Sequence, residues 1–310
     1  MTAHDATAVV ITGVGVVSPL GNGCAANAAA LRGGQSGIRP IAAFDAHGFP
    51  VQCAGEVPQA ELARGGGRPE ALARMALHEA LSQAALATAA DPRRAFSFAI
   101  GKPTLDLPGL ARGRAQWQAQ GDPAAALEAL PHLEVERTRA EPPALLQRMA
   151  HAAGAAGPRF SCYTACASGN DAIGLGLRLI QRGEADVVIT GGTDCQVHPL
   201  SLLEFELLSA LSHESADRAC RPFDRGRSGF VVGEGAAALV LESAAHARRR
   251  GARPLARLAG YGSSLDAFGL TKCHPQGRGA ALAMRAALAD AGLAPGDVDY
   301  LNAHGTGTVL

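Results

Sequence analysis

From residue 159 onward, short apolar runs rich in β-branched residues alternate with longer stretches rich in Ala and Leu. The apolar runs predict strands over 159–164, 184–190, 230–242, 253–263 and 298–302, preceded by strands over 8–12 and 96–100. The longer stretches predict helices over 23–32, 69–90, 166–182 and 279–292. Strands that alternate with helices are typical of an α/β fold with a mostly parallel sheet.

The charge balance excludes several classes of partner. The 310 residues include 28 basic and 28 acidic side chains, and 47 % of the chain is hydrophobic. A chain without net charge has no electrostatic footprint for nucleic acid or for an anionic membrane surface. There is no apolar run of about 18 residues that could span a bilayer. We therefore expect a folded protein that binds no nucleic acid and has no membrane span.

The cysteines indicate a reducing compartment. There are seven, an odd number, at irregular spacing and with no C-x-x-C pair, which predicts neither a disulfide framework nor a zinc site. The first residues also lack the basic and apolar regions of a signal peptide. We expect reduced thiols, no metal and a cytoplasmic location.

A glycine pair near the N-terminus resembles a dinucleotide motif. Gly13 and Gly15 follow a predicted strand, but Ser18 occupies the position of the third glycine and no acidic residue lies between 18 and 44. A ribose hydroxyl would therefore have no carboxylate partner, and we interpret the glycines as a tight structural turn. The same strand-then-glycine pattern recurs at 255–262, which hints at a duplicated architecture.

The strongest chemical signal is a cysteine where a strand runs into a helix. Cys166 lies at this junction among the small residues Ala165, Ala167 and Gly169. The unpaired amides and dipole of a helix N-terminus stabilise a thiolate and can hold a developing oxyanion. An isolated Cys is most often a small buried hydrophobe, and this interpretation is kept for the other six.

A second signal is a histidine at the end of the last predicted strand. His304 follows 298–302 and precedes a Gly/Thr loop that carries Thr306 and Thr308. Ligand sites of α/β sheets lie at the carboxyl ends of strands. A neutral imidazole there can donate to a thioester or enolate oxygen or act as a base, although a lone His is more often structural.

Four segments together resemble the β-ketoacyl-acyl carrier protein synthases, the condensing enzymes of fatty acid and type II polyketide synthesis. They are VVITGVGVVSPLGNG (9–23), YTACASGNDAIGLGLRLIQRGEADVVITGGTD (163–194), RPFDRGRSGFVVGEGAAALVLE (221–242) and NAHGTGT (302–308). The resemblance implies a thiolase-like five-layered αβαβα sandwich of two similar halves. Residues 1–252 would form the first half, with an atypical cap or insertion around 101–158, and 253–310 would begin an incomplete second half.

The resemblance also implies roles for individual residues. Cys166 matches the nucleophile, His304 matches a catalytic His, and Thr306 and Thr308 match threonines that contact the phosphopantetheine arm of the carrier. Asp224 and Glu234 match motif positions that we interpret as structural. The implied reaction is acylation of the Cys166 thiolate, followed by decarboxylative Claisen condensation with a malonyl thioester, without metal or other cofactor. The implied partners are an acyl carrier protein with phosphopantetheine-linked acyl and malonyl groups, and a second synthase chain in a homodimer or heterodimer.

Two alternatives stay open at this point. Family members are longer chains, and their C-terminal part carries a second catalytic His, a Lys and a glycine-rich segment. The lack of these motifs here favours a non-condensing partner subunit similar to a chain-length factor, or acyl transfer without condensation. The presence of Cys166 favours the condensing enzyme, because chain-length factors typically lack the nucleophile. We exclude a Rossmann-type oxidoreductase, because the acidic residue that would bind the ribose hydroxyl is missing.

Overall fold

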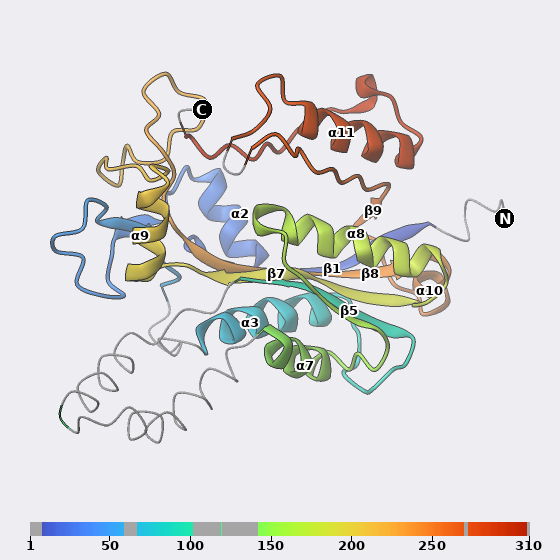
Figure 1. Cartoon of the computed structure of the whole chain (residues 1–310). Coiled ribbons are helices and arrows are strands. Elements are labelled where there is room, and N and C mark those ends of the chain that lie inside the picture. Colours follow the sequence, from blue (N-terminus) through green and yellow to red (C-terminus); the bar gives the residue numbers. More distant parts are fainter. Residues whose placement is uncertain (1–7, 59–66, 102–118, 120–141, 270–271, 309–310) are drawn as a thin grey trace.

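One mixed β-sheet organises the molecule. The computed structural model describes residues 8–58, 67–101, 119, 142–269 and 272–308 (Figure 1). The strand order is β2-β1-β8-β7-β5-β6, and β9 also pairs with β1. The strands of this sheet are β1 (Val9–Ser18), β2 (Gly21–Asn22), β5 (Arg94–Ile100), β6 (Arg159–Cys162), β7 (Val187–Cys195), β8 (Glu234–Ser243) and β9 (Ala256–Leu258).

The expectation of a mostly parallel sheet is wrong. Only β5–β6 and β5–β7 are parallel pairs among the described strands, whereas β8 is antiparallel to both β1 and β7. The reason is the connection after β7, which passes through α9 (Pro199–Leu207) and returns to the sheet at the same edge. A strand that re-enters at the edge where its neighbour ends must run antiparallel to it.

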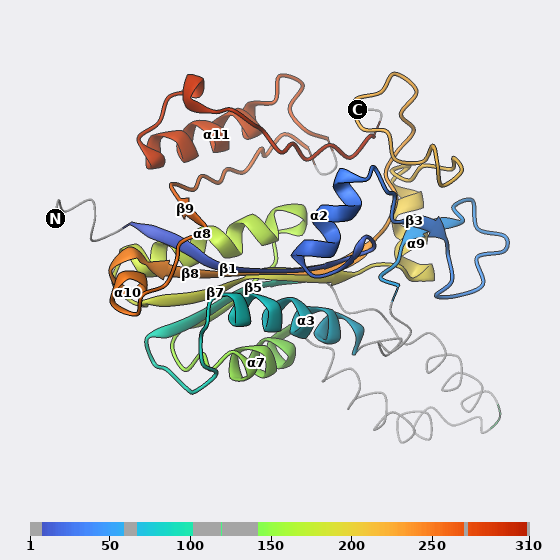
Figure 2. The same cartoon turned by 180° about the vertical axis from the view of Figure 1, so that it is seen from behind.

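Helices cover both faces of the sheet, as Figures 1 and 2 show from opposite sides. One face carries α3 (Arg68–Gln83) and α7 (Pro142–Ala152), and the other carries α2 (Cys24–Arg32) and α8 (Ser168–Gln181). The first interface is a core that includes Phe96, Phe98, Leu72 and Met149. The second includes Leu177, Ile180, Val188 and Leu241. The remaining elements are β3 (Ile38–Pro40), β4 (Cys53–Gly55), α10 (Ala244–Arg249) and α11 (Arg278–Ala291).

Gly13 and Gly15 lie inside β1 and form no turn, which corrects the sequence interpretation. A Cβ at Gly15 would lie 1.9 Å from the carbonyl oxygen of Ala76, and one at Gly13 would lie 2.1 Å from that of Ala80. Because these atoms belong to the backbone of α3, the glycines are required for the close approach of helix and strand.

The same packing recurs in the C-terminal part of the chain. A Cβ at Gly260 would lie 2.7 Å from the carbonyl oxygen of Ala287, and one at Gly262 would lie 2.2 Å from that of Ala283, both on α11. Two glycines with one residue between them thus face two alanines four positions apart, as in β1 and α3. In this second case the glycines lie in the segment that follows β9, so the close glycine–helix approach recurs but the strand does not extend to it.

This contact leads to a stability prediction. Gly15→Ala is expected to lower the free energy of unfolding by about 1–3 kcal/mol, because α3 must move to admit the methyl group. Denaturant unfolding would measure the change as a shift of the midpoint at constant slope. Gly296→Ala is the matched control, because a Cβ there meets no atom within 4 Å. Equal midpoints for the two variants would contradict the prediction.

Two predicted strands differ from the structure. The strand expected over 253–263 is limited to Ala256–Leu258, and the strand expected over 298–302 is wrong because those residues have no ladder partner among the described residues. Tyr300 and Leu301 are exposed. A strand forms only where a second strand accepts its backbone hydrogen bonds, which apolar alternation alone does not supply.

Helix boundaries show smaller differences. α11 confirms the helix expected over 279–292, whereas α3 ends at Gln83 and not at 90. β7 continues through Gly191 and Gly192, which pair with Ala238 and Ala237 of β8 and do not end the strand. The helices expected near 109–120 and 123–130 lie outside the described residues apart from 119. The later part of the expected cap, 142–158, is described, and its α7 belongs to the core on the face of the sheet that carries α3. Within the described part of the chain, no helix is long and apolar enough to cross a membrane.

Candidate active site

Cys166 lies on a tight turn between β6 and α8. β6 ends at Cys162, a 3-10 turn spans Ala165–Ala167, and α8 begins at Ser168. Ala165 has a φ of +52°, in the left-handed region that residues with a Cβ rarely adopt. The helix therefore starts two residues later than the sequence predicts, because the chain must reverse within the turn before helical hydrogen bonding can begin. The Cys166 thiol is free and exposed.

Short hydrogen bonds on both sides of Cys166 hold the turn. The amide of Thr164 donates to Ser168 Oγ (2.7 Å), and the Ser168 hydroxyl donates to the carbonyl of Ala165 (2.6 Å). The amide of Ala167 donates to the carbonyl of Thr164 (3.2 Å). Within the described residues no hydrogen bond engages the Cys166 thiol itself. The backbone is thus anchored while the sulfur remains available.

The exposed cysteines are distinct from the buried ones. Burial raises the pKa of the thiols of Cys24, Cys53, Cys162 and Cys195, with Glu79 adding to the effect at Cys24 and Glu234 at Cys195. A thiol held protonated in an apolar site is a poor nucleophile. Cys166, Cys220 and Cys273 are exposed, and Cys166 is the one of these three on a turn between a parallel strand and a helix.

The segment that carries His304 packs on the loop before β8. The amide of Gly229 donates to the carbonyl of Gly307 (3.0 Å), and Arg227 Nε donates to the carbonyl of Thr308 (3.2 Å). The hydroxyls of Thr306 and Thr308 are 2.8 Å apart and hydrogen-bonded to each other. The His304 side chain is exposed. The backbone of this loop is therefore fixed while its imidazole faces open space.

The Cys166 turn and the loop that carries His304 lie at one edge of the sheet. β5, β6 and β7 are parallel, so their carboxyl ends share an edge, and the Cys166 turn follows β6 directly. The loop that holds Gly307 leads into β8, whose first residue Glu234 pairs with Cys195 at the carboxyl end of β7. No hydrogen bond joins Cys166 to His304 among the described residues. The topology brings them to the same edge, and a direct catalytic contact stays a prediction.

The two motif carboxylates interpreted as structural both form internal contacts. Glu234 is buried, pairs with Arg68, and accepts the amide of Val57 (2.8 Å). Asp224 Oδ1 accepts the amide of Gly226 (2.6 Å) in the exposed loop before β8. Glu234 therefore holds both the start of α3, through Arg68, and the loop after β4, through Val57, against the start of β8.

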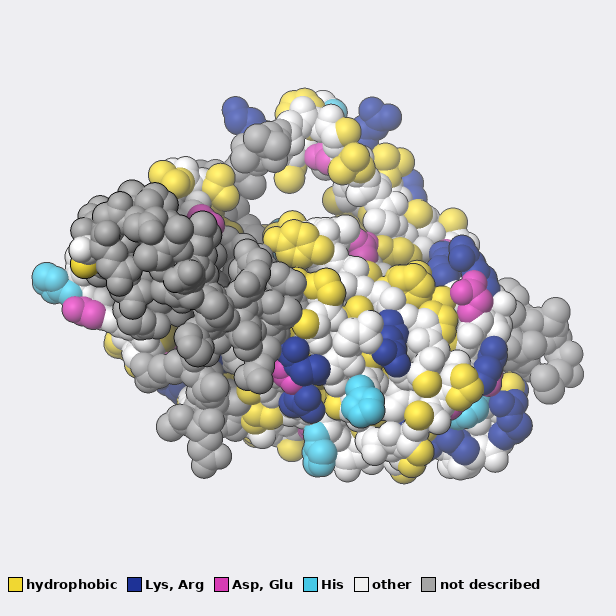
Figure 3. All heavy atoms as spheres, turned by 60° about the horizontal axis from the view of Figure 1, so that its bottom comes forward, with side chains coloured by type: hydrophobic (Ala, Val, Ile, Leu, Met, Phe, Trp, Pro, Cys, Tyr) yellow, Lys and Arg dark blue, Asp and Glu magenta, His cyan; other side chains and the backbone are white. Residues whose placement is uncertain are grey.

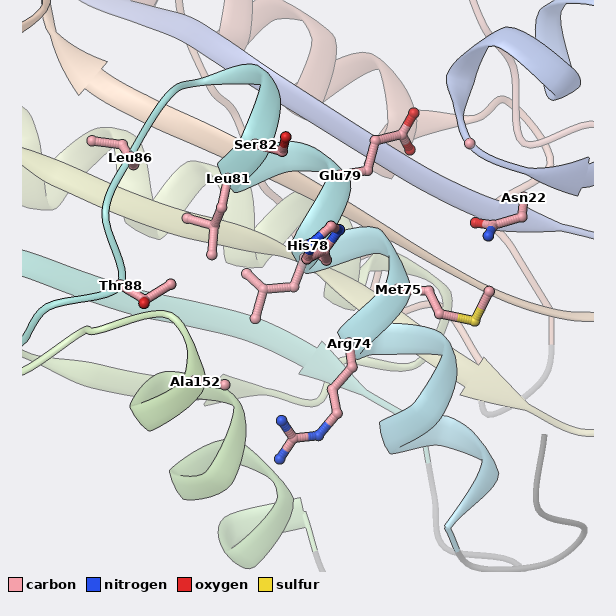
Figure 4. Close-up of a pocket in the computed structure, with 12 residues that line it drawn as sticks. Asn22, Arg74, Met75, His78, Glu79, Leu81, Ser82, Leu86, Thr88 and Ala152 are labelled. Atoms are coloured by element: carbon pink, nitrogen blue, oxygen red, sulfur yellow. The ribbon is translucent and has the colours of Figure 1, made fainter. Parts of the chain in front are cut away.

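A large groove lies elsewhere, along α3. It has a volume of about 840 Å³ and is lined by residues that include Arg74, His78 and Glu79, with Asn22 and Ala152 at its borders (Figure 4). α3 and α8 lie on opposite faces of the sheet (Figure 1). On the α3 and α7 face, charged and hydrophobic side chains are interspersed over the described part (Figure 3).

The groove contains none of the predicted site residues. The carboxylate of Glu79 is already engaged there, because it accepts the amides of Val16 (2.9 Å) and Cys24 (2.7 Å). Among the described residues no group of three or more His, Cys, Asp or Glu side chains is placed to hold a metal ion.

Sequence reasoning missed three residues around the Cys166 turn. They are Ser168, which bonds the turn, and Asp171 and Tyr261, which contact each other. Local capping could have been predicted from the sequence, because the polar residues Thr164, Ser168 and Asp171 are closely spaced around the start of the predicted helix. Tyr261 carried no such signal, since it lies 90 positions from Asp171 in the chain.

The fold and this edge define a class of protein. A mixed sheet with helices on both faces, a close glycine–helix approach that occurs twice and a thiol between a strand and a helix fit a thiolase-like α/β fold. Two family models match the chain: beta-ketoacyl synthase, N-terminal domain, over residues 123–247, and beta-ketoacyl synthase, C-terminal domain, over residues 255–310.

Known proteins agree with this class. The chain is 36 % identical over 312 residues to 3-oxoacyl-[acyl-carrier-protein] synthase 2 of Staphylococcus aureus, covering 97 % of this chain and 73 % of that protein. It is 38 % identical over 323 residues to the tetracenomycin polyketide synthase ketoacyl synthase alpha subunit of Streptomyces glaucescens, covering 99 % and 74 %. A solved type II polyketide synthase acyl-carrier protein in complex with its ketosynthase bound to the hexaketide superimposes with a TM-score of 0.85 at 30 % identity, covering 97 % and 74 %.

The chain therefore belongs to the β-ketoacyl synthase family, whose members are condensing acyltransferases. It spans about three quarters of the length of the relatives that it matches.

Proposed function

We propose that the chain carries an acyl group on Cys166 and condenses it with a malonyl thioester, with His304 assisting at the enolate. The observation that carries this proposal is the position of Cys166, an exposed thiol on a turn anchored on both sides, at the sheet edge where the His304 loop is held. Family membership supplies the class of reaction, and the residue roles are our assignment.

The first step is acyl transfer. The Cys166 thiolate attacks the carbonyl carbon of an acyl thioester, and a carbon–sulfur bond forms as the tetrahedral oxyanion develops. Backbone amides at the turn, including that of Cys166, are suited to stabilise this charge. Collapse of the intermediate expels the carrier thiolate, which takes up a proton, and leaves the acyl group on Cys166.

The second step forms the carbon–carbon bond. A malonyl thioester loses CO2, and the electron pair of the broken bond becomes an enolate. A neutral His304 imidazole donates a hydrogen bond to the enolate oxygen or assists the loss of CO2. The enolate carbon attacks the acyl-cysteine carbonyl, the new bond forms, and the Cys166 thiolate leaves unchanged.

We assign the binding of the carrier's phosphopantetheine arm to the loop after His304. The Thr306 and Thr308 hydroxyls, which bond to each other, are polar groups in this loop that can bind the amides of a phosphopantetheine chain. The acyl carrier protein complex of the structural relative supports this class of partner.

A second synthase chain is assigned to the free edge of β6. Among the described strands β6 is the last in the sheet order, and Arg159, Phe160 and Ser161 in it are exposed. An edge strand with unpaired backbone groups is a template for pairing with another strand. We propose a dimer through this edge, with a second copy or with a second subunit of the kind that the tetracenomycin alpha subunit implies by its name.

The proposal also includes the division of the fold into two halves and the cellular compartment of the protein. Residues 1–252 would form the first thiolase-like half, with the cap around 101–158, and 253–310 the beginning of the second. The repeated contact of Gly13 and Gly15 with α3, and of Gly260 and Gly262 with α11, supports this division. Seven free thiols support a reducing, cytoplasmic setting.

The test is to locate the acyl group. After incubation with an acyl carrier thioester, peptide mass spectrometry is expected to find the acyl group on Cys166 and not on Cys220 or Cys273, which are also exposed. Addition of a malonyl carrier is then expected to release CO2 and yield the product extended by two carbons.

The other outcomes separate the alternatives. Acylation of Cys166 without extension would indicate acyl transfer alone. A folded chain that takes up no acyl group would indicate a non-condensing partner subunit. Acylation at Cys220 or Cys273 would overturn the assignment.

A further inference from the structure

The side chain of Asp171 connects the nucleophile turn to a distant part of the chain. Asp171 lies in the first turn of α8, and its Oδ2 accepts a hydrogen bond from the Thr164 hydroxyl, two residues before Cys166. Its Oδ1 accepts the hydroxyl of Tyr261, and the Ser263 hydroxyl lies 3.4 Å from the same oxygen. One carboxylate thus bonds the turn with one oxygen and the 261–263 segment with the other.

Tyr261 is held against about two turns of α8, from Asp171 to Arg178. A Cβ at Gly174, one helical turn after Asp171, would lie 2.4 Å from the ring of Tyr261. Further along α8, Arg178 NH1 pairs with Asp290 (2.8 Å), whose other oxygen accepts the amide of Tyr261 (2.8 Å). Asp171, Gly174 and Arg178 share one helix face, which the Tyr261 residue covers. The hydroxyl is therefore directed at Asp171 by contacts on the ring and on the backbone.

The turn itself needs such support. Ala165 holds a backbone conformation that costs of order 1–3 kcal/mol and persists only where neighbouring contacts enforce it. Thr164 is the residue before Ala165, and its amide, carbonyl and hydroxyl are all engaged, by Ser168, Ala167 and Asp171. Of these three bonds, the one to Asp171 reaches outside the turn.

We propose that Asp171 is a positioning residue that holds the Cys166 turn in the geometry needed for acyl transfer and couples this geometry to Tyr261. The inference rests on the proposed function of Cys166. Asp171 acts through Thr164 and does not touch the acyl group. The coupling means that a displacement of the 261–263 segment changes the reactivity of a thiol on a different part of the fold.

Three variants test the proposal in the full chain. Asp171→Ala removes both hydrogen bonds, and it is expected to lower the rate constant for acylation of Cys166 by roughly tenfold to a hundredfold with the KM for the thioester little changed. Asp171→Asn removes the charge but can still accept from one hydroxyl and donate to the other, so it is expected to recover most of the lost rate. Tyr261→Phe removes only the hydroxyl bond from Tyr261 and leaves the Ser263 hydroxyl 3.4 Å from the carboxylate, so it is expected to have an intermediate rate.

The controls are matched in chemistry. Asp299→Asn and Tyr300→Phe change the same residue types at exposed positions, with Tyr300 81 % exposed, and both are expected to acylate at the parent rate. Hydrogen exchange of the amides of 164–168 is a second measurement, expected to accelerate in Asp171→Ala and Tyr261→Phe but not in the controls. Thermal unfolding verifies that each variant is folded.

Several outcomes would overturn the proposal. One is acylation by folded Asp171→Ala within about twofold of the parent, the range of an ordinary surface substitution. Equal losses in Asp171→Asn and Asp171→Ala would assign the effect to charge. If Asp171→Ala does not fold, Tyr261→Phe decides, and parent-like rates and amide exchange in that variant contradict the coupling. If the parent itself takes no acyl group, the proposed function fails, and alkylation of Cys166 by iodoacetamide together with amide exchange still tests the positioning role.

Discussion

Replacing Cys166 with alanine is expected to lower acyl transfer from a carrier thioester by at least about a thousandfold, the scale of loss when an enzyme loses its nucleophile. The alanine methyl group cannot form the carbon–sulfur bond of the acyl intermediate. The turn should survive the change, because its hydrogen bonds run through Thr164, Ser168 and the backbone. The measurement is the rate of carrier thiol release together with the mass of the chain, which should show no acyl adduct.

The controls for this variant are the other exposed thiols. Cys220→Ala and Cys273→Ala should acylate at the parent rate, because neither thiol lies between a parallel strand and a helix. Cys166→Ser is a second probe, since it keeps a nucleophilic atom but one that is far less ionised at neutral pH. Persistent acylation of Cys166→Ala at another residue would contradict the assignment of the nucleophile.

The second large effect is expected at Glu242, at the far end of β8 from the candidate site. Its side chain is fully buried and accepts hydrogen bonds from Thr12, from His246 Nδ1 (2.7 Å) and from Arg250 Nε (2.8 Å). Glu242→Ala leaves the guanidinium of Arg250 without its carboxylate and is expected to cost about 3–5 kcal/mol of unfolding free energy. Denaturant unfolding at neutral pH would measure this, with Glu184→Ala on the surface as the control.

The pH dependence of this contribution follows from the direction of the pKa shift. Burial raises the pKa of Glu242, but the hydrogen bonds from Arg250, Thr12 and His246 more than offset it, and the net pKa lies below its usual value. The unfolded chain therefore binds the proton more tightly than the folded one. The stabilisation is present above the unfolded pKa of about 4.3 and is lost as pH falls through the folded value.

Unfolding curves of the parent and of Glu242→Gln at several pH values would test this sign. The difference in unfolding free energy between the two should narrow below about pH 4, where the unfolded carboxylate becomes protonated. A difference that stays constant down to pH values far below this would contradict an ionised Glu242 in the folded chain.

The turn at Cys166 shows what local pattern can and cannot predict. The apolar run over 159–164 and the helical period after it predicted the junction correctly, because both are local properties of the chain. The start of α8 was two residues in error, because the left-handed Ala165 and the bonds from Ser168 decide where helical geometry begins. Propensity does not reveal that a non-glycine residue is held in a strained conformation.

The glycines of β1 show a different error. A glycine pair after a strand is typical of a turn, but Gly13 and Gly15 continue the strand because α3 approaches them closely. The identity of the approaching helix, more than sixty positions away, is not contained in the local sequence. A similar close approach recurs between 260–262 and α11, and the duplicated architecture stays a prediction.

The amino-acid sequence by itself determined the family motifs, the α/β character, and Cys166, His304, Thr306 and Thr308 as the residues on which the proposed chemistry depends. The α/β character follows from short-range periodicity, and the four residues follow from their residue types together with the resemblance of short motifs to the family. The tertiary structure decided the antiparallel placement of β8, the docking of Gly307 on Gly229, and the Asp171–Tyr261 contact. Each of these is a hydrogen-bonded pairing between segments far apart in the chain, and such pairings depend on how distant surfaces fit and not on local pattern.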